Sequence, residues 1–229
     1  MIYESYPWKQ DLLKRKRLIL KYNHAELLFG DNDKAYTVIE KAIFYSAFII
    51  RKLIDCKGKV SDEVDAYQFN LKGIIPQKRI DYMHRWPDEN THDWEHELSY
   101  TKNGKEICNW LIHSFVFFLC YNDAGEIDSF YVSSDKDRNK ILYRVELKDW
   151  IDYIDFVGSD YVVATEMHAE DNKNDYESTY ETQGQKNLWK FLLNGQKKVY
   201  FQQQQDHVSN NFYLKVYHIH LYPQILLIL

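Results

Sequence analysis

The fold of this 229-residue chain is decided by the stretch 34-KAYTVIEKAIFYSAFIIRKLIDCKG-58. Its apolar residues recur every three or four positions, which predicts one long helix over residues 34–57. Gly58, which follows directly, is a typical helix stop. The apolar arc of this helix is wide and includes Ile39, Ile43, Phe44, Ala47, Ile50, Leu53 and Ile54. A wide arc indicates that the helix is buried on more than one side.

A second helix is expected immediately upstream, over residues 8–29. Leu13, Leu20 and Leu27 repeat every seven positions and place an apolar stripe along it. Gly30 is a suitable C-terminal cap, and the acidic and amide residues that follow it can cap the next helix. Because the link is so short, we expect the two helices to form an antiparallel hairpin.

Downstream of the hairpin the periodicity changes from that of a helix to that of a strand. Tyr67, Phe69 and Leu71 alternate with polar residues, as in a strand with one face on the core. Further elements are expected as a helix or strand from residue 106, strands at 80–86, 94–100, 115–121, 127–133 and 141–147, a hairpin turn at Asn103-Gly104 and a short helix at 149–157. The sequence therefore predicts an α+β fold, in which an N-terminal antiparallel helical hairpin packs on an antiparallel sheet of about five strands.

The character of the chain changes after about residue 165. Residues 166–185 are polar and acidic without a period, which favours a loop or a mobile segment. Residues 212–229 are rich in β-forming residues and end on an apolar run that needs to be paired or buried. We therefore expect an α+β core domain over residues 1–165 and a C-terminal extension over 166–229, partly mobile or packed on the core or on a partner.

Bulk composition limits the classes of function. A net charge of −5 argues against a general role in coating nucleic acid but leaves a local basic patch open. The three cysteines are odd in number and lack C-x-x-C spacing, and the charged N-terminal stretch does not fit a secretory signal. No apolar run is long enough to span a bilayer. These features predict a soluble, cytoplasmic protein without a membrane partner.

The densest polar cluster lies over residues 84–97. Its candidate ligands for a divalent metal are His84, Asp88, His92 and His96. On a helix, the H-x-x-x-H spacing of His92 and His96 places both imidazoles on one face, but Asp93 stands where zinc proteases carry Glu. A solvated loop is the simpler interpretation, and without such a metal no cofactor is expected.

Three other residues are candidates for catalytic groups. His113 lies in an apolar run, so a buried histidine with a hydrogen-bond partner is the simplest expectation, and a place in a pocket is the sharper one. Glu40 and Arg51 are three helical turns apart and share a face of the helix at 34–57. If buried, Arg51 could contact an anion, although an arginine that reaches solvent is the more common case.

No segment carries a motif specific enough to name a reaction, since a phosphate-binding glycine loop, a nucleophile elbow and a redox cysteine pair are all missing. The aromatic content of 16% and the β-prone C-terminal segment favour a non-enzymatic protein-interaction module, with a protein partner or self-association through that segment. The alternative is a metal-dependent hydrolase, with nucleic acid as one substrate class, that uses the cluster at residues 84–97.

Overall fold

The computed structural model describes residues 2–30, 33–169, 176–182, 202–205 and 212–216, with side chains up to Val162. The chain has two compact units. The first comprises Met1–Cys56 and Glu63–Ser159, and the second comprises Lys57–Asp62 and Asp160–Leu229. The second unit thus takes in Lys57–Asp62 and the chain from Asp160 onward, whereas the sequence predicts a change of character at Glu166.

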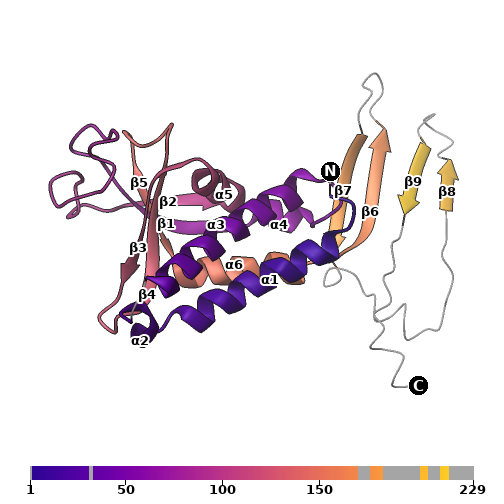
Figure 1. The fold of residues 1–229 in the computed structure, drawn as a ribbon. Coiled ribbons are helices and arrows are strands. Elements are labelled where there is room, and N and C mark those ends of the chain that lie inside the picture. The colour runs from indigo at the N-terminus through magenta and orange to yellow at the C-terminus, as the bar shows by residue number, and fades with distance from the viewer. Residues whose placement is uncertain (1, 31–32, 170–175, 183–201, 206–211, 217–229) are drawn as a thin grey trace. The chain divides into compact units, whose positions relative to one another are not determined.

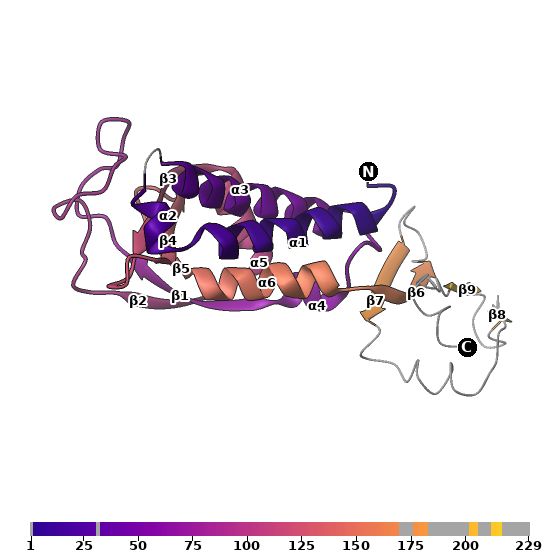
Figure 2. The same ribbon diagram turned by 60° about the horizontal axis from the view of Figure 1, so that its bottom comes forward.

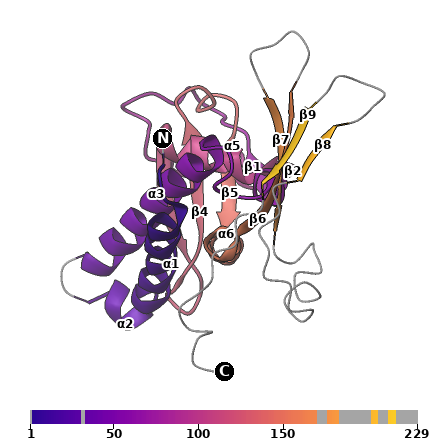
Figure 3. The ribbon, with the colours of Figure 1, turned by 90° about the vertical axis from the view of Figure 1, so that its right-hand side faces the viewer.

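The helices of the first unit include the predicted N-terminal hairpin. They are α1 (Ser5–Tyr22), α2 (Ala25–Leu28), α3 (Lys34–Asp55), α5 (Gly104–Ile112) and α6 (Leu147–Ser159), and a short helix α4 covers Asp62–Ala66. Helices α1 and α3 lie side by side, and α6 lies along α1 (Figures 2 and 3). The single helix expected at 8–29 is broken at Asn23, because the Asn23 side chain exchanges two hydrogen bonds of 2.7 and 2.8 Å with the backbone of Ile127.

The five strands of the first unit form one antiparallel sheet with the order β2-β1-β5-β4-β3. They are β1 (Gln68–Ile74), β2 (Leu98–Asn103), β3 (Ser114–Tyr121), β4 (Ile127–Ser134) and β5 (Leu142–Glu146). The predicted fold class, a helical hairpin on an antiparallel sheet of five strands, is therefore confirmed. For the stretch from residue 106 to 121 the sequence left helix and strand open, and the structure divides it into most of α5 and the whole of β3.

One face of the sheet is covered by helices through large aromatic contacts. The ring of Trp150 on α6 is fully buried and lies 6.3 Å from Phe69 on β1 and 6.1 Å from Phe130 on β4. Its indole nitrogen donates a 3.1 Å hydrogen bond to Ser46 on α3, which satisfies the one polar atom of the side chain. Phe44 on α3 reaches Phe117 on β3 at 4.6 Å between ring centroids. The hairpin and α6 thus share one core with the sheet.

The opposite face is covered by the loop of residues 75–97, which lies on the other side of β3 and β4 from the helices (Figure 1). Ile80 is fully buried against this face, and Trp94 packs edge-on against Tyr131 at 5.8 Å. The backbone amide of Ile80 donates to the side chain of Asn139 at 2.7 Å rather than to a neighbouring strand. The strand expected at 80–86 is therefore wrong, and the strand expected at 94–100 begins only at Leu98. The alternation of apolar residues in these two segments is explained by side chains that pack onto the sheet, rather than by hydrogen bonds between strands.

Asn103-Gly104 begins a helix rather than a hairpin. The Asn103 side chain accepts from the amide of Glu106 at 2.8 Å, and the Glu106 carboxylate accepts from the amide of Asn103 at 3.1 Å. This is a capping box, which satisfies free amides at a helix N-terminus. Gly104 is required because the ring of Tyr153 occupies the space where a Cβ would stand. The predicted hairpin turn is therefore wrong, because an asparagine followed by glycine is also suited to the N-cap of a helix.

The second unit contains a four-stranded antiparallel sheet with the order β7-β6-β9-β8. Its strands are β6 (Val162–Ala169), β7 (Tyr176–Thr182), β8 (Gln202–Gln205) and β9 (Phe212–Val216). The loop predicted for residues 166–185 is thus wrong where β6 and β7 run. The apolar end of the C-terminal segment proposed for self-association, residues 217–229, lies outside the described residues. In the part of the chain that the structure describes, no helix combines the length and apolar character that a membrane span requires.

Candidate functional site

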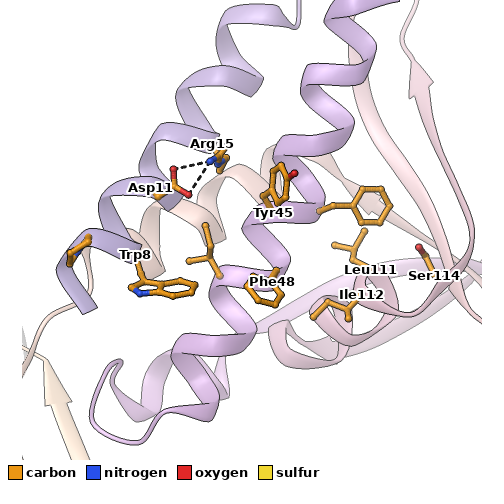
Figure 4. Close-up of a pocket in the computed structure, with 11 residues that line it drawn as sticks. Trp8, Asp11, Arg15, Tyr45, Phe48, Leu111, Ile112 and Ser114 are labelled. Carbon is orange, nitrogen blue, oxygen red and sulfur yellow. Dashed lines mark hydrogen bonds and ion pairs between the residues drawn. The ribbon is translucent and has the colours of Figure 1, made fainter. Parts of the chain in front are cut away.

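An open groove runs over the exposed side of α3, between α1 and the C-terminal end of α5 (Figure 4). Its volume is about 800 Å³, and its lining is mainly apolar. The side chains that define it are Trp8, Asp11 and Arg15 from α1, Phe44, Tyr45 and Phe48 from α3, and Leu111 and Ile112 from α5. We call this feature the aromatic groove.

Tyr45 and Phe48, which line the groove, belong to an exposed stripe of residues along α3. Lys41, Tyr45, Phe48 and Lys52 are exposed and stand four, three and four positions apart, so they form one stripe along the helix. We call this stripe the α3 crest. Tyr45 is 52% exposed and Phe48 is 44% exposed, although the opposite side of the same helix is fully buried. Neither residue belongs to the apolar arc predicted for this helix, whose members are all buried or half-buried, so apolar side chains of α3 extend beyond that arc onto the surface.

The two walls of the groove hold these aromatic rings in place. On one wall, Trp8 lies 6.4 Å from Phe48 between ring centroids, and the guanidinium of Arg15 lies 5.1 Å from the centre of the Tyr45 ring. Arg15 also donates to both carboxylate oxygens of Asp11, at 2.9 and 3.0 Å. On the other wall, Ile112 is 40% exposed. The groove therefore combines exposed apolar side chains with rims that are fixed by packed helices.

The charges near the groove are unevenly compensated. Asp11 is paired with Arg15, and Asp55 is paired with Arg51, with Lys105 at 3.9 Å. Lys41 and Lys52 form no ion pair with any residue that the structure describes, and the Lys52 ammonium lies 5.8 Å from the Phe48 ring. Asp11 and Asp55 are thus neutralised locally, whereas the two cations at the ends of the α3 crest have no ion-pair partner among the described residues.

The three candidate catalytic residues do not form one constellation. The Nε of Arg51 donates to the side chain of Asn109 at 2.7 Å, which ties α3 to α5, and a second nitrogen bonds Asp55. Glu40 is half-buried and lies about 16 Å from Arg51 along the helix axis. His113 is exposed, so its expected burial is wrong, because the residue caps the end of α5 instead of continuing an apolar run. It stands between Ile112 and Ser114, which both line the groove.

The candidate metal ligands each have a local partner in the loop of residues 75–97. Two exposed histidines bond nearby carboxylates at 2.9 Å, His84 to Asp81 and His96 to Asp93. The Asp88 carboxylate accepts a hydrogen bond from the amide of Asn90, a local loop contact.

His92 differs from these residues because it is buried at the base of the loop, where its Nδ1 lies 3.0 Å from the Thr91 hydroxyl. Burial lowers the pKa of His92 to about 4. No group of three or more His, Cys, Asp or Glu side chains within the described residues is arranged to hold a metal. The metal hypothesis stays a prediction, and the described geometry does not favour it.

Comparison of the chain with protein-family models, with curated proteins and with solved structures finds no match. The aromatic groove is therefore the feature that bears on function, and its central residues, Trp8, Tyr45 and Phe48, were not candidates from the sequence. One signal was present: Tyr45 and Phe48 lie in one stripe with Lys41 and Lys52, as on the solvent side of a helix. Aromatic residues in such a stripe indicate a surface for binding rather than for the core.

Proposed function

We propose that this chain is a non-enzymatic protein-interaction module and that its aromatic groove binds a helical segment of a partner protein. The observation that carries the proposal is the exposure of Tyr45 and Phe48 on a helix whose other side is fully buried. Full burial of a large apolar side chain contributes about 1.5–3 kcal/mol, so a side chain that stays half exposed forgoes about 1 kcal/mol. Contiguous exposed aromatic residues with an arginine are also typical of the central part of protein interfaces.

The shape of the groove favours a helix over a small molecule. Small-molecule sites enclose most of their ligand, whereas this groove is open along the α3 crest. The residues of the crest follow helical spacing, so a second helix laid along α3 meets them with its own stripe of side chains. Recognition of a helix in an apolar groove reads such i, i+3 and i+4 anchors.

The polar side chains of the groove support binding rather than catalysis. The carboxylate of Asp11 is already occupied by two hydrogen bonds from Arg15. General acid–base catalysis needs a titratable group that is free to reach a substrate proton. In the described lining, the ion pair of Asp11 and Arg15 therefore stabilises the wall of the groove and positions Arg15 over the ring of Tyr45.

The proposal is tested by selecting peptides from a random display library on the full chain. Selected peptides are expected to lose at least about tenfold in affinity on Phe48→Ala or Tyr45→Ala, because truncation of a central aromatic residue at an interface typically costs more than 1 kcal/mol. Tyr82→Ala is the matched control, since Tyr82 is an exposed tyrosine that does not line the groove. Two results would contradict the proposal: peptides that bind the unaltered chain and all three variants with the same affinity, or a library that yields no binder.

A further inference from the structure

We infer that the aromatic groove binds an acidic amphipathic helix, with apolar anchors at its centre and a carboxylate near each end. This inference rests on the proposed function and adds the chemistry of the partner. It is carried by two observations, the uncompensated cations at the ends of the α3 crest and the distance between them.

Positive charge is concentrated on the helical hairpin. Helices α1 and α3 together carry ten Lys or Arg and three Asp or Glu, within a chain whose net charge is −5. Near the groove, Asp11 and Asp55 are neutralised by arginines, whereas Lys41 and Lys52 have no ion-pair partner among the described residues. The surface that a partner meets along the α3 crest is therefore positive at both ends, which selects an acidic partner.

The spacing of the crest defines the pattern of the partner. Lys41 and Lys52 are eleven residues apart, or about 16 Å along the helix, with Tyr45 and Phe48 between them. A helix that lies along α3 has the same rise per residue, so its contacting side chains follow the same spacing. The matching segment therefore has two apolar residues three positions apart, an acidic residue four positions before the first and another four positions after the second. This pattern reads identically in both chain directions.

The aromatic residues and the lysines contribute differently to such a complex. The crest lysines lie at the exposed rim, where an ion pair contributes little to affinity but sets the preference between partners. Tyr45 and Phe48 lie between them and are covered by the bound helix. We therefore expect the aromatic residues to control the strength of binding and the lysines to control which charge is accepted.

The probe is a fluorescent alanine-based helical peptide with Leu at the two apolar positions and Glu at the two outer positions. Its charge-swapped twin carries Lys in place of both Glu residues, and a scrambled peptide gives the background. Binding to the full chain is measured by fluorescence anisotropy at low ionic strength. The Glu peptide is expected to bind about tenfold more tightly than the Lys twin, and added salt is expected to reduce the difference.

The decisive variant is Lys41→Glu/Lys52→Glu, which is expected to reverse the preference so that the Lys twin binds more tightly. Lys78→Glu/Lys136→Glu is its control, because it makes the same change in net charge at two exposed lysines outside the groove and is expected to keep the original preference. Circular dichroism checks that each variant is folded. If Lys41→Glu/Lys52→Glu unfolds, Lys41→Gln/Lys52→Gln is used in its place, and this variant is expected to abolish the preference between the two peptides.

Three results overturn the inference: failure of the Glu peptide to exceed the scrambled background, equal binding of both peptides, or a preference that the crest substitution leaves unchanged. The peptide selection described above distinguishes these results from failure of the proposed function. If selected peptides still depend on Phe48 while the charge reversal has no effect, the groove binds a partner but the partner is not acidic.

Discussion

The two faces of the five-stranded sheet are covered by different kinds of structure. One face carries α6 and the helical hairpin, with Trp150 and Tyr153 inserted against the strands. The other face carries the loop of residues 75–97, anchored by Ile80 and Trp94. The helices supply their own backbone hydrogen bonds, whereas the amides of the loop bond partly to its own carbonyls, as Asp93 does to Ile75 at 3.0 Å, and partly to single side chains such as Asn139. A loop can therefore complete a core without regular structure, provided that its own carbonyls and single side chains satisfy its amides.

The same comparison predicts different consequences when each face is damaged. Loss of the helix-covered core is expected to destabilise the whole first unit, because helices and strands share it. Loss of the loop-covered core is expected to release mainly the loop, because few elements depend on it. The following substitutions test this difference, from the largest expected effect on stability to the smallest.

Trp150→Ala is expected to lower the free energy of unfolding by about 4 kcal/mol, because it removes a fully buried ring and leaves Ser46 without its indole donor. Chemical denaturation followed by far-ultraviolet circular dichroism measures the change. Trp86→Ala is the control, since Trp86 is 71% exposed and its loss is expected to change stability by less than about 0.5 kcal/mol. Similar effects for both tryptophans would show that α6 does not share the core.

Ile80→Ala is expected to cost about 3 kcal/mol, because Ile80 is the fully buried anchor of the loop. Hydrogen exchange is expected to show faster exchange across residues 75–97 and little change in α3. Ile75→Ala removes the same atoms from a half-exposed position and serves as the control. Faster exchange throughout the first unit would remove the distinction between the two faces.

Acidification is expected to weaken the loop-covered face through His92. Burial lowers the pKa of His92 from 6.5 to about 4, so the unfolded chain binds the proton more readily than the folded chain. Stability is therefore lost as the pH falls below 6.5, with a contribution of about 2 kcal/mol near pH 5. His92→Gln is expected to lose this contribution, as measured by denaturation at neutral pH and near pH 5. An identical pH dependence in the variant would show that His92 is not the group responsible.

Phe48→Ala is expected to have the smallest effect on stability, about 1 kcal/mol, because the side chain is only about half buried. The aromatic groove thereby differs from both faces of the sheet, since we propose that its aromatic residues serve binding rather than folding. Thermal unfolding measures the change, and Phe44→Ala is the comparison, because Phe44 packs on Phe117 and its loss is expected to cost more. A large loss of stability in Phe48→Ala would place this residue in the core.

Sequence periodicity predicted the helix-covered face well and the loop-covered face poorly. Helical and strand periods are local properties, so the hairpin, β1 and the strands at 115–121, 127–133 and 141–147 could be recognised from neighbouring residues. The apolar residues of the loop follow no backbone period, because Ile80 and Trp94 are placed by contacts with residues far away in the chain. The turn predicted at Asn103-Gly104 failed for a different, local reason, since an asparagine followed by glycine also suits the N-cap of α5.

The candidate site shows the same limit. Single polar residues such as His113 and Arg51 attracted attention as carriers of chemistry, yet the structure places them at a helix end and in an interhelical hydrogen bond. The residues that line the groove are aromatic, and a sequence does not say which of its 37 Phe, Trp and Tyr residues are exposed. Only the packing of α1 and α5 against α3 leaves Tyr45 and Phe48 at the surface.

The sequence by itself determined the class of fold and the wide apolar arc of α3, because both depend on the spacing of residues within single elements. The tertiary structure decided that two further aromatic residues of α3, Tyr45 and Phe48, stay at the surface. The buried side of α3 faces α1, α5 and α6, whereas Tyr45 and Phe48 on the remaining side touch side chains of α1 and stay about half exposed. Which part of an apolar helix is exposed depends on where other elements pack, and this information comes from distant contacts rather than from the helix itself.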